Sequence, residues 1–494
     1  MNAAEKLAPS HDELLSLRAA QHGWRATPLR RRLAVVRQLR REIASAATEL
    51  AATILPSLPG ALHRSPAETL TAEVLPLAEA CRFLEKEAAP ILDSYVAGKR
   101  ARPLWLSGIR VETRRLPLGI VLILAPANYP LFLPGVQVLQ ALVAGNAVLW
   151  KPAPGTSAPA HALRAMLVSS GLDPDLLLIL PESPAAAQHA IQAGVDKVFL
   201  TGSAETGKAV LGQLAQTLTP AVMELSGCDA VYVLPGADLN RAADAVAFGL
   251  RLNGSFTCMA PRRLFVTREN LEAFSNALLT RLANTEPVAI TPKTAALLGD
   301  LVTEATLYGA KILLNGLGDA APTGTGARLC GPTLLTEARP SMRISCTDIF
   351  APVASIIPMD SPADAARLHS ECRYRLTAAI FGPTRQAQQL AAQLDCGTVL
   401  LNDVIVSTAD PRVSFGGRGL SGFGVTRGID GLLEMTAPQT IIRNRSQNKL
   451  PYQPVTSAHA PFFAATIRLF HGGWKQLPSS LRAVARAGRK LKVQ

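Results

Sequence analysis

The segment NAVLWKPAPGTSAPAHALRAMLVSSGLDPDLLLIL (146–180) carries a short apolar run at each end and a helix-like stretch between them. NAVLWKP (146–152) and LLLIL (176–180) have the length and the continuous apolar character of buried strands. PAHALRAMLVSS (159–170) has the length of a helix that connects them. A strand, a helix and a strand in this order predict a parallel α/β sheet with a right-handed crossover.

The same alternation continues in both directions from this segment. Upstream, IRVETRRL (109–116) alternates apolar and polar residues, as an exposed strand does, and passes into the buried run PLGIVLIL (117–124). From His11 to about Ala52, apolar residues recur at helical spacing, which predicts one long amphipathic helix. Downstream, the next helix and strands are expected at PAAAQHAIQAG (184–194), KVFLTG (197–202), AVMEL (221–225) and AVYVL (230–234).

A second alternation of helices and strands begins after Asp238 and predicts a second α/β domain. Residues 285–325 show no regular pattern. VSFGGRGLSGFG (413–424) has five Gly in twelve positions, which predicts a loop because Gly makes regular structure costly. The helices of this second part are expected at 238–252 and 270–284, and its strands at 262–267 and near 334–336, 352–358, 377–381 and 398–401.

Composition excludes several classes of protein. A length of 494 residues predicts two to four folded units at about 100–200 residues each, and 48% hydrophobic with 18% charged residues excludes wholesale disorder. Seven Cys without a CxxC pair indicate neither a disulfide framework nor a zinc site, and favour a reducing compartment. The start MNAAEKLAPSHDELL is not typical of a secretion signal, and no run of about 18 apolar residues occurs. A cytoplasmic protein without a membrane span is expected.

The positive charge is concentrated at the C-terminal end of the chain. The net charge is +13, and no acidic residue follows Glu434. Such asymmetry predicts an anionic partner, or else a solvated extension that touches nothing. The ten cations after residue 440 are Arg443, Arg445, Lys449, Arg468, Lys475, Arg482, Arg486, Arg489, Lys490 and Lys492.

Apolar residues accompany these cations in a pattern that resembles an interfacial segment on an anionic membrane. The alternative is that the same aromatic residues pack against a partner subunit. No nucleic acid is expected, because the tail lacks aromatic residues interleaved with its cations in a stacking pattern. The apolar residues are Phe462, Phe463, Ile467, Leu469, Phe470 and Trp474.

Two side chains are candidates for nucleophilic chemistry on a carbonyl group. Cys258 lies in a loop of small polar residues, NGSFTCMAPRR, between an expected helix and an expected strand. A thiol in such a place is either a nucleophile or a small core residue. Glu224 ends the strand AVMEL, at the edge of the sheet where ligands bind in α/β proteins, and it either acts as a base for water or caps a turn.

Two further segments could bind reacting or cofactor groups. Asn128 in APANYPLFLPG follows a strand and precedes a helix, so its amide either donates to an oxyanion or caps that helix. The turn TGSAETGK (201–208) contains Gly202, Ser203 and Gly207 between a strand and a helix. A helix N-terminus there could accept a pyrophosphate, although the turn is not the G-x-G-x-x-G fingerprint.

Several short motifs follow one another in a fixed order along the chain. They are Asn128 in NYP, Lys151 in KPA, the GS-x-x-x-G turn at 202–207, Glu224 in MEL-x-G, Cys258 placed 34 positions after Glu224, IFAPV at 349–353 and FGG-x-x-x-SG-x-G at 415–424. Together they resemble the aldehyde dehydrogenase superfamily over roughly residues 15–450. The short N-terminus, NYP in place of NFP, and LTPAVMEL look most like the class 3, fatty-aldehyde branch.

This resemblance implies two Rossmann-like domains and a small β-flap that pairs the subunits of a homodimer. The cofactor-binding domain would span 1–225, with 105–118 contributing to the flap, and the catalytic domain 226–412. A return segment with an oligomerisation strand would follow at 413–450, and a basic extension at 451–494. The implied partners are a small-molecule aldehyde and NAD or NADP, and no metal is implied.

The resemblance also implies roles for individual residues. Cys258 would be the nucleophile and Glu224 the general base for deacylation, while the Asn128 side chain and the Cys258 backbone amide would form the oxyanion hole. Lys151 would bind the adenosine ribose. The pyrophosphate would lie at Ser203 in the Gly202–Gly207 turn, the nicotinamide ribose at Asp348, and the nicotinamide beside Phe350.

Three positions depart from the family pattern. Pro154 stands where the family commonly has a Glu that binds the adenosine ribose, so one reason to exclude the 2′-phosphate of NADP is gone. Asp348 is one methylene shorter than the usual Glu. Ser226 adds a side chain where Gly allows close approach of the backbone to the cofactor.

The residues favour an enzyme that oxidises an aldehyde to a carboxylic acid with NAD or NADP. The first rival is an acylating enzyme or acyl reductase, which passes the thioester to coenzyme A; Glu224 speaks against it, because such enzymes generally lack the deacylating Glu. The second rival is a catalytically silent cofactor-binding protein. The basic tail leaves open a peripheral position at the inner face of a membrane.

Overall fold

The computed structural model describes residues 10–54, 64–317, 327–446, 452 and 454–491. The chain divides into two compact units, a larger one of residues 1–95 and 113–439 and a smaller one of 96–112 and 440–494. Part of the N-terminal sequence, part of the segment 285–325, and the tail cations Lys449 and Lys492 lie outside the described residues.

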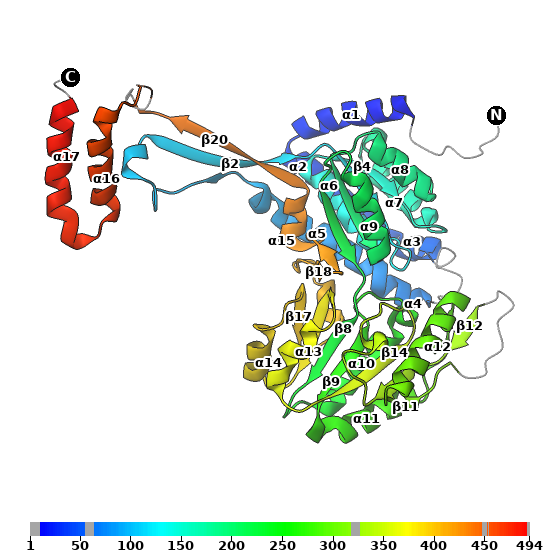
Figure 1. The fold of residues 1–494 in the computed structure, drawn as a ribbon. Helices are drawn as coiled ribbons and strands as arrows, with labels where there is room; N and C mark the ends of the chain where they lie inside the picture. Colours follow the sequence, from blue (N-terminus) through cyan, green and yellow to red (C-terminus); the bar gives the residue numbers. More distant parts are fainter. Residues whose placement is uncertain (1–9, 55–63, 318–326, 447–451, 453, 492–494) are drawn as a thin grey trace. The chain divides into compact units, whose positions relative to one another are not determined.

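The larger unit contains a six-stranded sheet, of which β4 is labelled in Figure 1, and its strand order is β19-β7-β6-β3-β4-β5. Strands β3 to β7 pair in parallel, and only the short β19 runs antiparallel, along β7. Their near-continuous apolar sequences suit a sheet that is covered on both faces. The bounds are β3 Ile120–Leu124, β4 Ala147–Lys151, β5 Leu177–Ile179, β6 Lys197–Gly202, β7 Ala221–Leu225 and β19 Gly422–Phe423.

Helices before and between these strands bury the sheet in one apolar core. Trp150 of β4 and Phe199 of β6 are completely buried in it. The connecting helices are α6 Phe132–Ala144, α7 Ser157–Ser169, α8 Pro184–Gln192 and α9 Ala204–Leu214. The preceding helices are α1 His11–Ala26, α2 Leu29–Ser45, α3 Ala47–Ile54, α4 Pro66–Thr69, the π-helix η2 Leu70–Val74 and α5 Leu75–Leu92.

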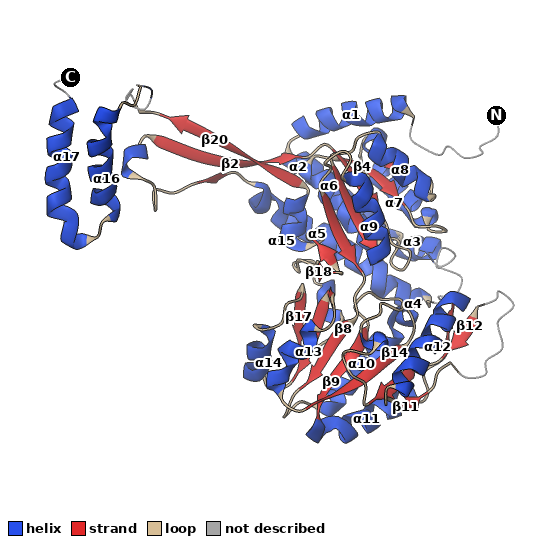
Figure 2. Ribbon diagram, in the orientation of Figure 1, coloured by secondary structure: helices blue, strands red, loops and turns tan. Residues whose placement is uncertain are grey.

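A second, seven-stranded sheet follows in the order β11-β13-β14-β9-β8-β16-β17 (Figure 2). All neighbours pair in parallel except β11, which runs antiparallel to β13. Tyr232 and Phe265 face one apolar core, and their chain neighbours Val231 and Leu264 face another, because successive strand residues point to opposite faces. The bounds are β8 Asp229–Val233, β9 Pro261–Thr267, β11 Lys311–Leu314, β13 Thr333–Thr336, β14 Val353–Met359, β16 Thr377–Phe381 and β17 Thr398–Leu401.

The remaining elements of the larger unit are short or lie between these strands. The helices are α10 Leu239–Arg251, α11 Arg268–Leu282, α12 Pro292–Leu307, α13 Ala365–Ser370, α14 Thr384–Ala391 and α15 Gly428–Glu434. Two small antiparallel pairs are β10 Val288–Ile290 with β12 Arg328–Cys330, and β15 Tyr374–Arg375 with β18 Arg418–Gly419.

The structure corrects three expectations. The single helix expected over 11–52 is three helices, because Pro28 cannot continue α1 and the chain breaks again at Ala46. The described part of the segment 285–325, residues 285–317, is not irregular, since it contains β10, α12 and β11. The Gly-rich segment 413–424 is mostly loop, but it also contributes the two-residue strands β18 and β19.

Strands β1 Tyr95–Val96, β2 Ile109–Pro117 and β20 Thr436–Asn444 form a three-stranded sheet in the order β1-β2-β20. In the smaller unit, the amide of Arg445 donates to the carbonyl of Gly108 at 3.0 Å. Helices α16 Ala460–His471 and α17 Leu477–Leu491 pack against each other in the same unit. Among the described residues, no helix combines the length and the apolar character needed to cross a bilayer.

Candidate active site

Cys258 follows a turn whose backbone is strained. In this turn, Leu252–Ser255, both Asn253 (φ 53°) and Ser255 (φ 65°) adopt left-handed conformations. Each such non-Gly residue costs on the order of 1 kcal/mol, so other contacts must hold the turn. The buried Arg262 does this: its Nη1 donates to Ser255 Oγ and its Nη2 to the Ser255 carbonyl, each at 2.9 Å. The nucleophile candidate is thus placed by a fixed, strained loop.

Glu224 lies on β7 and faces Cys258. Its register partners are Thr201 on β6 and Gly422 on β19, so the carboxylate stands between two strands. The Cys258 thiol donates to Glu224 Oε1 at 3.7 Å, and the Thr201 hydroxyl donates to Oε2 at 3.2 Å. The structure therefore brings together a thiol and a carboxylate that are 34 positions apart in the sequence.

Burial dominates the electrostatics of this pair. It raises the pKa of Glu224 above its ordinary value, while Arg427 and the hydrogen bonds from Thr201 and Cys258 act in the opposite direction. Burial also raises the pKa of Cys258, and the neighbouring Glu224 charge raises it further. Burial thus favours the uncharged form of both groups, and the hydrogen bond places the carboxylate, when it is ionised, to accept the thiol proton.

Asn128 lies in the loop between β3 and α6 and reaches the turn before Cys258. Its side-chain Nδ2 donates to the Phe256 carbonyl at 2.8 Å. Its backbone carbonyl accepts hydrogen bonds from Arg64 Nη2 at 2.6 Å and from Asn253 Nδ2 at 3.0 Å. Asn128 is thus held at both its side chain and its backbone.

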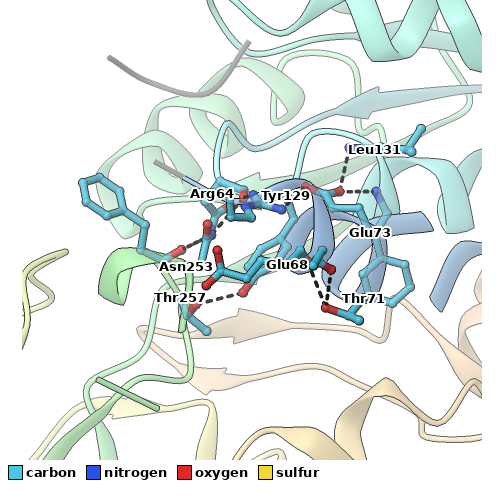
Figure 3. Close-up of polar contacts among 12 residues, drawn as sticks. Arg64, Glu68, Thr71, Glu73, Tyr129, Leu131, Asn253 and Thr257 are labelled. Carbon is cyan, nitrogen blue, oxygen red and sulfur yellow. Dashed lines mark hydrogen bonds and ion pairs between the residues drawn. The ribbon is translucent and has the colours of Figure 1, made fainter. Parts of the chain in front are cut away.

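A buried ion pair between Arg64 and Glu73 supports the loop that carries Asn128. Arg64 Nη1 lies 2.9 Å from Glu73 Oε1, and the two side chains are 1% and 0% exposed. Glu73 Oε2 accepts the backbone N–H groups of Leu131 and Phe132, where α6 begins (Figure 3). The Arg64 guanidinium also lies over the Tyr129 ring, 5.3 Å from its centroid. Removing one partner of such a pair costs about 3–5 kcal/mol, because it leaves a buried charge uncompensated.

Two cavities meet at Cys258 and Glu224. One has a volume of about 360 Å³ and opens over the carboxyl ends of β3, β6 and β7, where ligands bind in α/β sheets. The other has a volume of about 650 Å³, and its wall is largely apolar, with Phe132, Phe248 and Phe415 among the lining residues. Cys258 and Glu224, with Leu133, line both.

The smaller cavity gathers most of the residues expected at a cofactor. Its lining includes Asn128, Gly202, Ser203, Asp348 and Phe350. Ser203 caps α9, and its hydroxyl accepts the N–H of Thr206 at 3.2 Å. The Phe350 ring lies 5.7 Å from the Phe256 ring.

Two of the three departures from the family pattern lie in contact. Asp348 and Ser226 are joined by a side-chain hydrogen bond, and burial raises the pKa of Asp348 while this bond opposes the shift. The Ser226 hydroxyl also donates to the Gly202 carbonyl at 3.4 Å. The side chain of Ser226 thus contacts the carboxylate of Asp348, which is one methylene shorter than the usual Glu.

Two expected cofactor residues lie outside this lining. Lys151 ends β4, and burial lowers its pKa while the charge of Glu182 raises it. Gly207 lies inside α9, where an added Cβ atom would come within 2.8 Å of Leu225 Cδ1. The structure therefore gives Gly207 a role in helix–strand packing.

Several site residues could not be found from the sequence. Arg64 and Glu73 carry no motif, and only their joint burial reveals them. Arg427 is buried beside Phe415, with its guanidinium 4.6 Å from the ring centroid, and its charge acts on Glu224. A buried Arg cannot be told from an exposed one by composition, because long charged side chains occur on most surfaces.

Comparison with known proteins identifies the family. Residues 14–441 match the family model described as "Aldehyde dehydrogenase family". The chain belongs to this family. The match confirms the expected enzyme class, an NAD(P)-dependent aldehyde dehydrogenase, and the α/β fold with two Rossmann-like sheets.

Individual relatives of this aldehyde dehydrogenase are named for different activities. A 4,4'-diapolycopene aldehyde oxidase of Methylomonas sp is 29% identical over 460 residues, covering 91% of this chain and 84% of the relative. A putative succinate-semialdehyde dehydrogenase [NADP(+)] of Mycolicibacterium smegmatis is 28% identical over 451 residues, covering 88% and 84%. The crystal structure of an NADP-dependent glyceraldehyde-3-phosphate dehydrogenase from Bacillus halodurans C-125 superposes with a TM-score of 0.78 at 26% identity, covering 88% and 91%.

Proposed function

We propose that this aldehyde dehydrogenase oxidises an apolar aldehyde to a carboxylic acid with Cys258 as nucleophile and Glu224 as general base. The observation that carries the proposal is that both side chains line two cavities at once. One cavity suits a dinucleotide at the ends of parallel strands, and the other suits an apolar substrate. The reacting groups therefore stand where the two ligands would meet.

The proposed chemistry begins with the thiol. Glu224 Oε1, which accepts the Cys258 thiol hydrogen bond, takes the proton as sulfur adds to the aldehyde carbon. The Asn128 amide and the Cys258 backbone N–H then stabilise the oxyanion of the thiohemiacetal. NAD or NADP, when bound, supplies the hydride acceptor. Glu224 next removes a proton from the water that cleaves the Cys258 thioester.

The residues of the smaller cavity fit a nicotinamide cofactor. Gly202 and Ser203 end a parallel strand and begin a helix, where backbone N–H groups and the helix dipole favour a pyrophosphate. Asp348 is assigned to the nicotinamide ribose, Phe350 to the nicotinamide, and Lys151 to the adenosine ribose. Residues 1–225 would form the cofactor-binding domain and 226–412 the catalytic domain.

The larger cavity favours an aldehyde with a long apolar chain, as in the class 3 branch. Its volume of about 650 Å³ lies in the range of drug-sized ligand pockets. Polar side chains such as Glu68 and Arg251 also line this cavity, but most of its wall is apolar, which favours a substrate with a long apolar chain. The relative named for a diapolycopene aldehyde is consistent with this class.

Hydrolytic deacylation is favoured over transfer to coenzyme A. A transferase needs no base for water, yet Glu224 is buried and its carboxylate accepts the hydrogen bond of the nucleophile. The test of the whole proposal is NAD(P)H formation by the purified protein with aliphatic and aromatic aldehydes of increasing length, each with NAD and with NADP. Hydrolytic oxidation would be rejected if NAD(P)H formation required coenzyme A. It would also be rejected if the protein formed no more NAD(P)H than Cys258→Ala does.

The smaller unit is proposed to pair subunits through its sheet and to meet an anionic membrane through its helices. Exposed apolar side chains and exposed cations share α16, α17 and the turn between them. Each cation near an anionic surface contributes about 1 kcal/mol. The exposed apolar residues are Phe463, Ile467, Phe470, Trp474, Leu477 and Leu481.

The membrane proposal is tested by sedimentation with vesicles of increasing phosphatidylserine content. A variant carrying Arg482→Gln, Arg486→Gln and Arg489→Gln should bind less, and the difference should disappear at high salt. The membrane proposal would be rejected if the parent protein and the variant bound equally, or if binding did not depend on the phosphatidylserine content. The same samples in sedimentation velocity show whether the protein is the proposed homodimer.

A further inference from the structure

Three of the seven cysteines gather at one place next to the cofactor cavity. Cys228 directly precedes β8, Cys346 follows the short turn Arg343–Ser345, and Cys372 lies just before β15. Cys228 and Cys372 are buried in one cluster, and the partly exposed Cys346 packs against it. None of these three residues has a role in the proposed oxidation of aldehydes.

The three sulfur atoms form a connected set. Cys228 and Cys372 pack in one buried cluster with Cys346 against it, and the electrostatic interactions of Cys228 and Cys346 both involve Cys372. Cys228 Sγ donates to the Ser345 carbonyl at 3.5 Å, and Cys346 Sγ donates to the Pro340 carbonyl at 3.1 Å and lies 3.9 Å from the Glu371 carbonyl oxygen. Cys372 is therefore the central member, with one thiol on each side.

A buried cation accompanies the cluster. Arg263 on β9 is fully buried, and its Nε donates to the Cys228 carbonyl at 2.8 Å. Its Nη1 and Nη2 atoms have no hydrogen-bond partner among the described residues. The nearby Asp229 carboxylate accepts the Thr377 N–H at 3.0 Å and the Thr377 hydroxyl at 2.6 Å, and Arg263 makes no hydrogen bond to it in the described part of the chain.

An unpaired buried guanidinium is costly, so an anion beside it is favoured. Cys372 is suited to be that anion. Hydrogen bonds from Cys228 and Cys346 lower the pKa of the Cys372 thiol, and the Arg263 charge lowers it further, although burial opposes both. A thiolate beside a second, more exposed thiol is the arrangement that oxidises readily to a disulfide.

We propose that Cys346 and Cys372 form a reversible, peroxide-sensitive thiol pair that adjusts the cofactor site. The Cys372 thiolate attacks a hydroperoxide, ROOH, that enters beside the more exposed Cys346; a sulfenic acid forms at Cys372, and the departing alkoxide takes up a proton to give the alcohol ROH. The Cys346 thiol then attacks the Cys372 sulfur and loses its proton. A disulfide forms, and the departing hydroxide takes up a proton to give water. A thiol reductant restores both cysteines by exchange.

The disulfide would act through the chain segment after Cys346. A disulfide holds its sulfur atoms about 2.05 Å apart, closer than two hydrogen-bonded sulfurs, so the backbone must shift on at least one side. Asp348 lies two residues after Cys346, and Phe350 four. This consequence rests on the proposed cofactor roles of Asp348 and Phe350, whereas the disulfide itself does not. Oxidation is expected to weaken cofactor binding.

Peptide mapping tests the pair directly. The Cys258→Ala protein is treated with hydrogen peroxide at a low molar ratio, alkylated without reduction and digested with trypsin. Cys346 and Cys372 fall on separate tryptic peptides, residues 344–367 and 368–373, while Cys228 lies on 209–241. We expect the first two peptides to be linked, and the link to be absent in Cys346→Ser and in Cys372→Ala. A link from 209–241 to 368–373 instead, or no link, would overturn the proposal.

Cofactor binding tests the consequence in the same proteins. NADPH titrated by fluorescence should bind at least about threefold more weakly after oxidation, and a thiol reductant should restore binding. Cys330→Ser, which removes a buried cysteine elsewhere, is the matched control and should respond like the parent. A linked protein with unchanged affinity would overturn the regulatory effect. If NADPH binds neither form, the proposed cofactor site fails, and the mapping still decides the disulfide.

Discussion

The Cys258 thiol donates a hydrogen bond to Glu224 Oε1, with 3.7 Å between the sulfur and the oxygen. The same carboxylate is therefore placed to accept a proton twice, first from the nucleophile and later from the water that cleaves the thioester. Thr201 holds the other oxygen, Oε2, at 3.2 Å. Without Cys258 no bond to the aldehyde forms, whereas without Glu224 the proton transfers are slowed. Variants of Cys258 and Glu224 should therefore fail at different points of the reaction.

Replacing Cys258 by Ala should abolish oxidation and leave cofactor affinity nearly unchanged, because the sulfur bonds only to the aldehyde carbon. Steady-state turnover and NADPH titration measure the two effects. Cys396→Ala, a buried cysteine outside both cavities, is the control and should retain activity. Turnover of Cys258→Ala within about tenfold of the parent would contradict the assignment.

The Glu224→Gln variant should still produce NAD(P)H in its first turnover, although deacylation should be slow. A burst followed by a weak steady state is expected in stopped-flow absorbance. The burst itself should be slower than in the parent, since the Gln amide cannot accept the Cys258 proton. An equal loss of burst and steady state, accompanied by a lower unfolding temperature, would instead indicate that the residue is structural.

The deacylation rate should rise with pH through the raised pKa of Glu224. Burial favours the protonated acid, and only the ionised carboxylate acts as a base. The inflection is therefore expected above the ordinary Glu value of about 4.3, with low rates on its acid side. Single-turnover decay of the acyl-enzyme measures it. Persistence of the same inflection in Glu224→Gln would mean that another group titrates.

Glu73→Gln should lower both stability and kcat without changing cofactor affinity. The substitution leaves the buried Arg64 guanidinium without its counter-charge, which costs about 3–5 kcal/mol. Because Arg64 also holds the Asn128 carbonyl, the oxyanion donor should lose its position. Thermal unfolding and steady-state kinetics measure the two effects. Glu79→Gln, at the exposed ion pair with Arg82, is the matched control and should be close to neutral.

NADP should be used with an efficiency within about a hundredfold of NAD, since Pro154 carries no charge to repel a 2′-phosphate. One carboxylate nevertheless lies near Lys151. Although burial opposes ionisation, hydrogen bonds from the backbone of Gly155 and Ser157 lower the pKa of Glu182. Glu182→Gln should therefore shift the preference further toward NADP. If the parent protein prefers NAD by more than about a thousandfold, another residue must exclude the 2′-phosphate of NADP.

The sequence predicts the buried parallel strands well, because their signal is local. KVFLTG (197–202) and AVMEL (221–225) are apolar runs of strand length, and the observed strands β6 and β7 have these bounds. Pro28 is also visible in the sequence, but the apolar spacing continues through it and predicts a single helix. Periodicity reports which face is buried, not where the chain bends.

Long-range contacts could not be predicted from one sequence. Arg64 and Glu73 are near each other in the chain, but the Asn128 loop that they hold has no sequence relation to them. The cysteines of the proposed pair likewise lie far from Cys228 in the chain, with no recurring spacing. Such groups are brought together by the order of the strands, which local patterns do not encode.

The pairing of Glu224 with Gly422 has a consequence for biosynthesis. A ribosome that has released the chain through Leu401 has delivered every strand of the seven-stranded sheet, but not β19, which completes the six-stranded sheet beside the base. Until then Glu224 stands on an open edge strand, whose unpaired backbone groups attract other chains. Premature termination before Phe423 should thus yield protein that is inactive and prone to aggregate. Only chains whose catalytic unit has been completely synthesised should therefore be active.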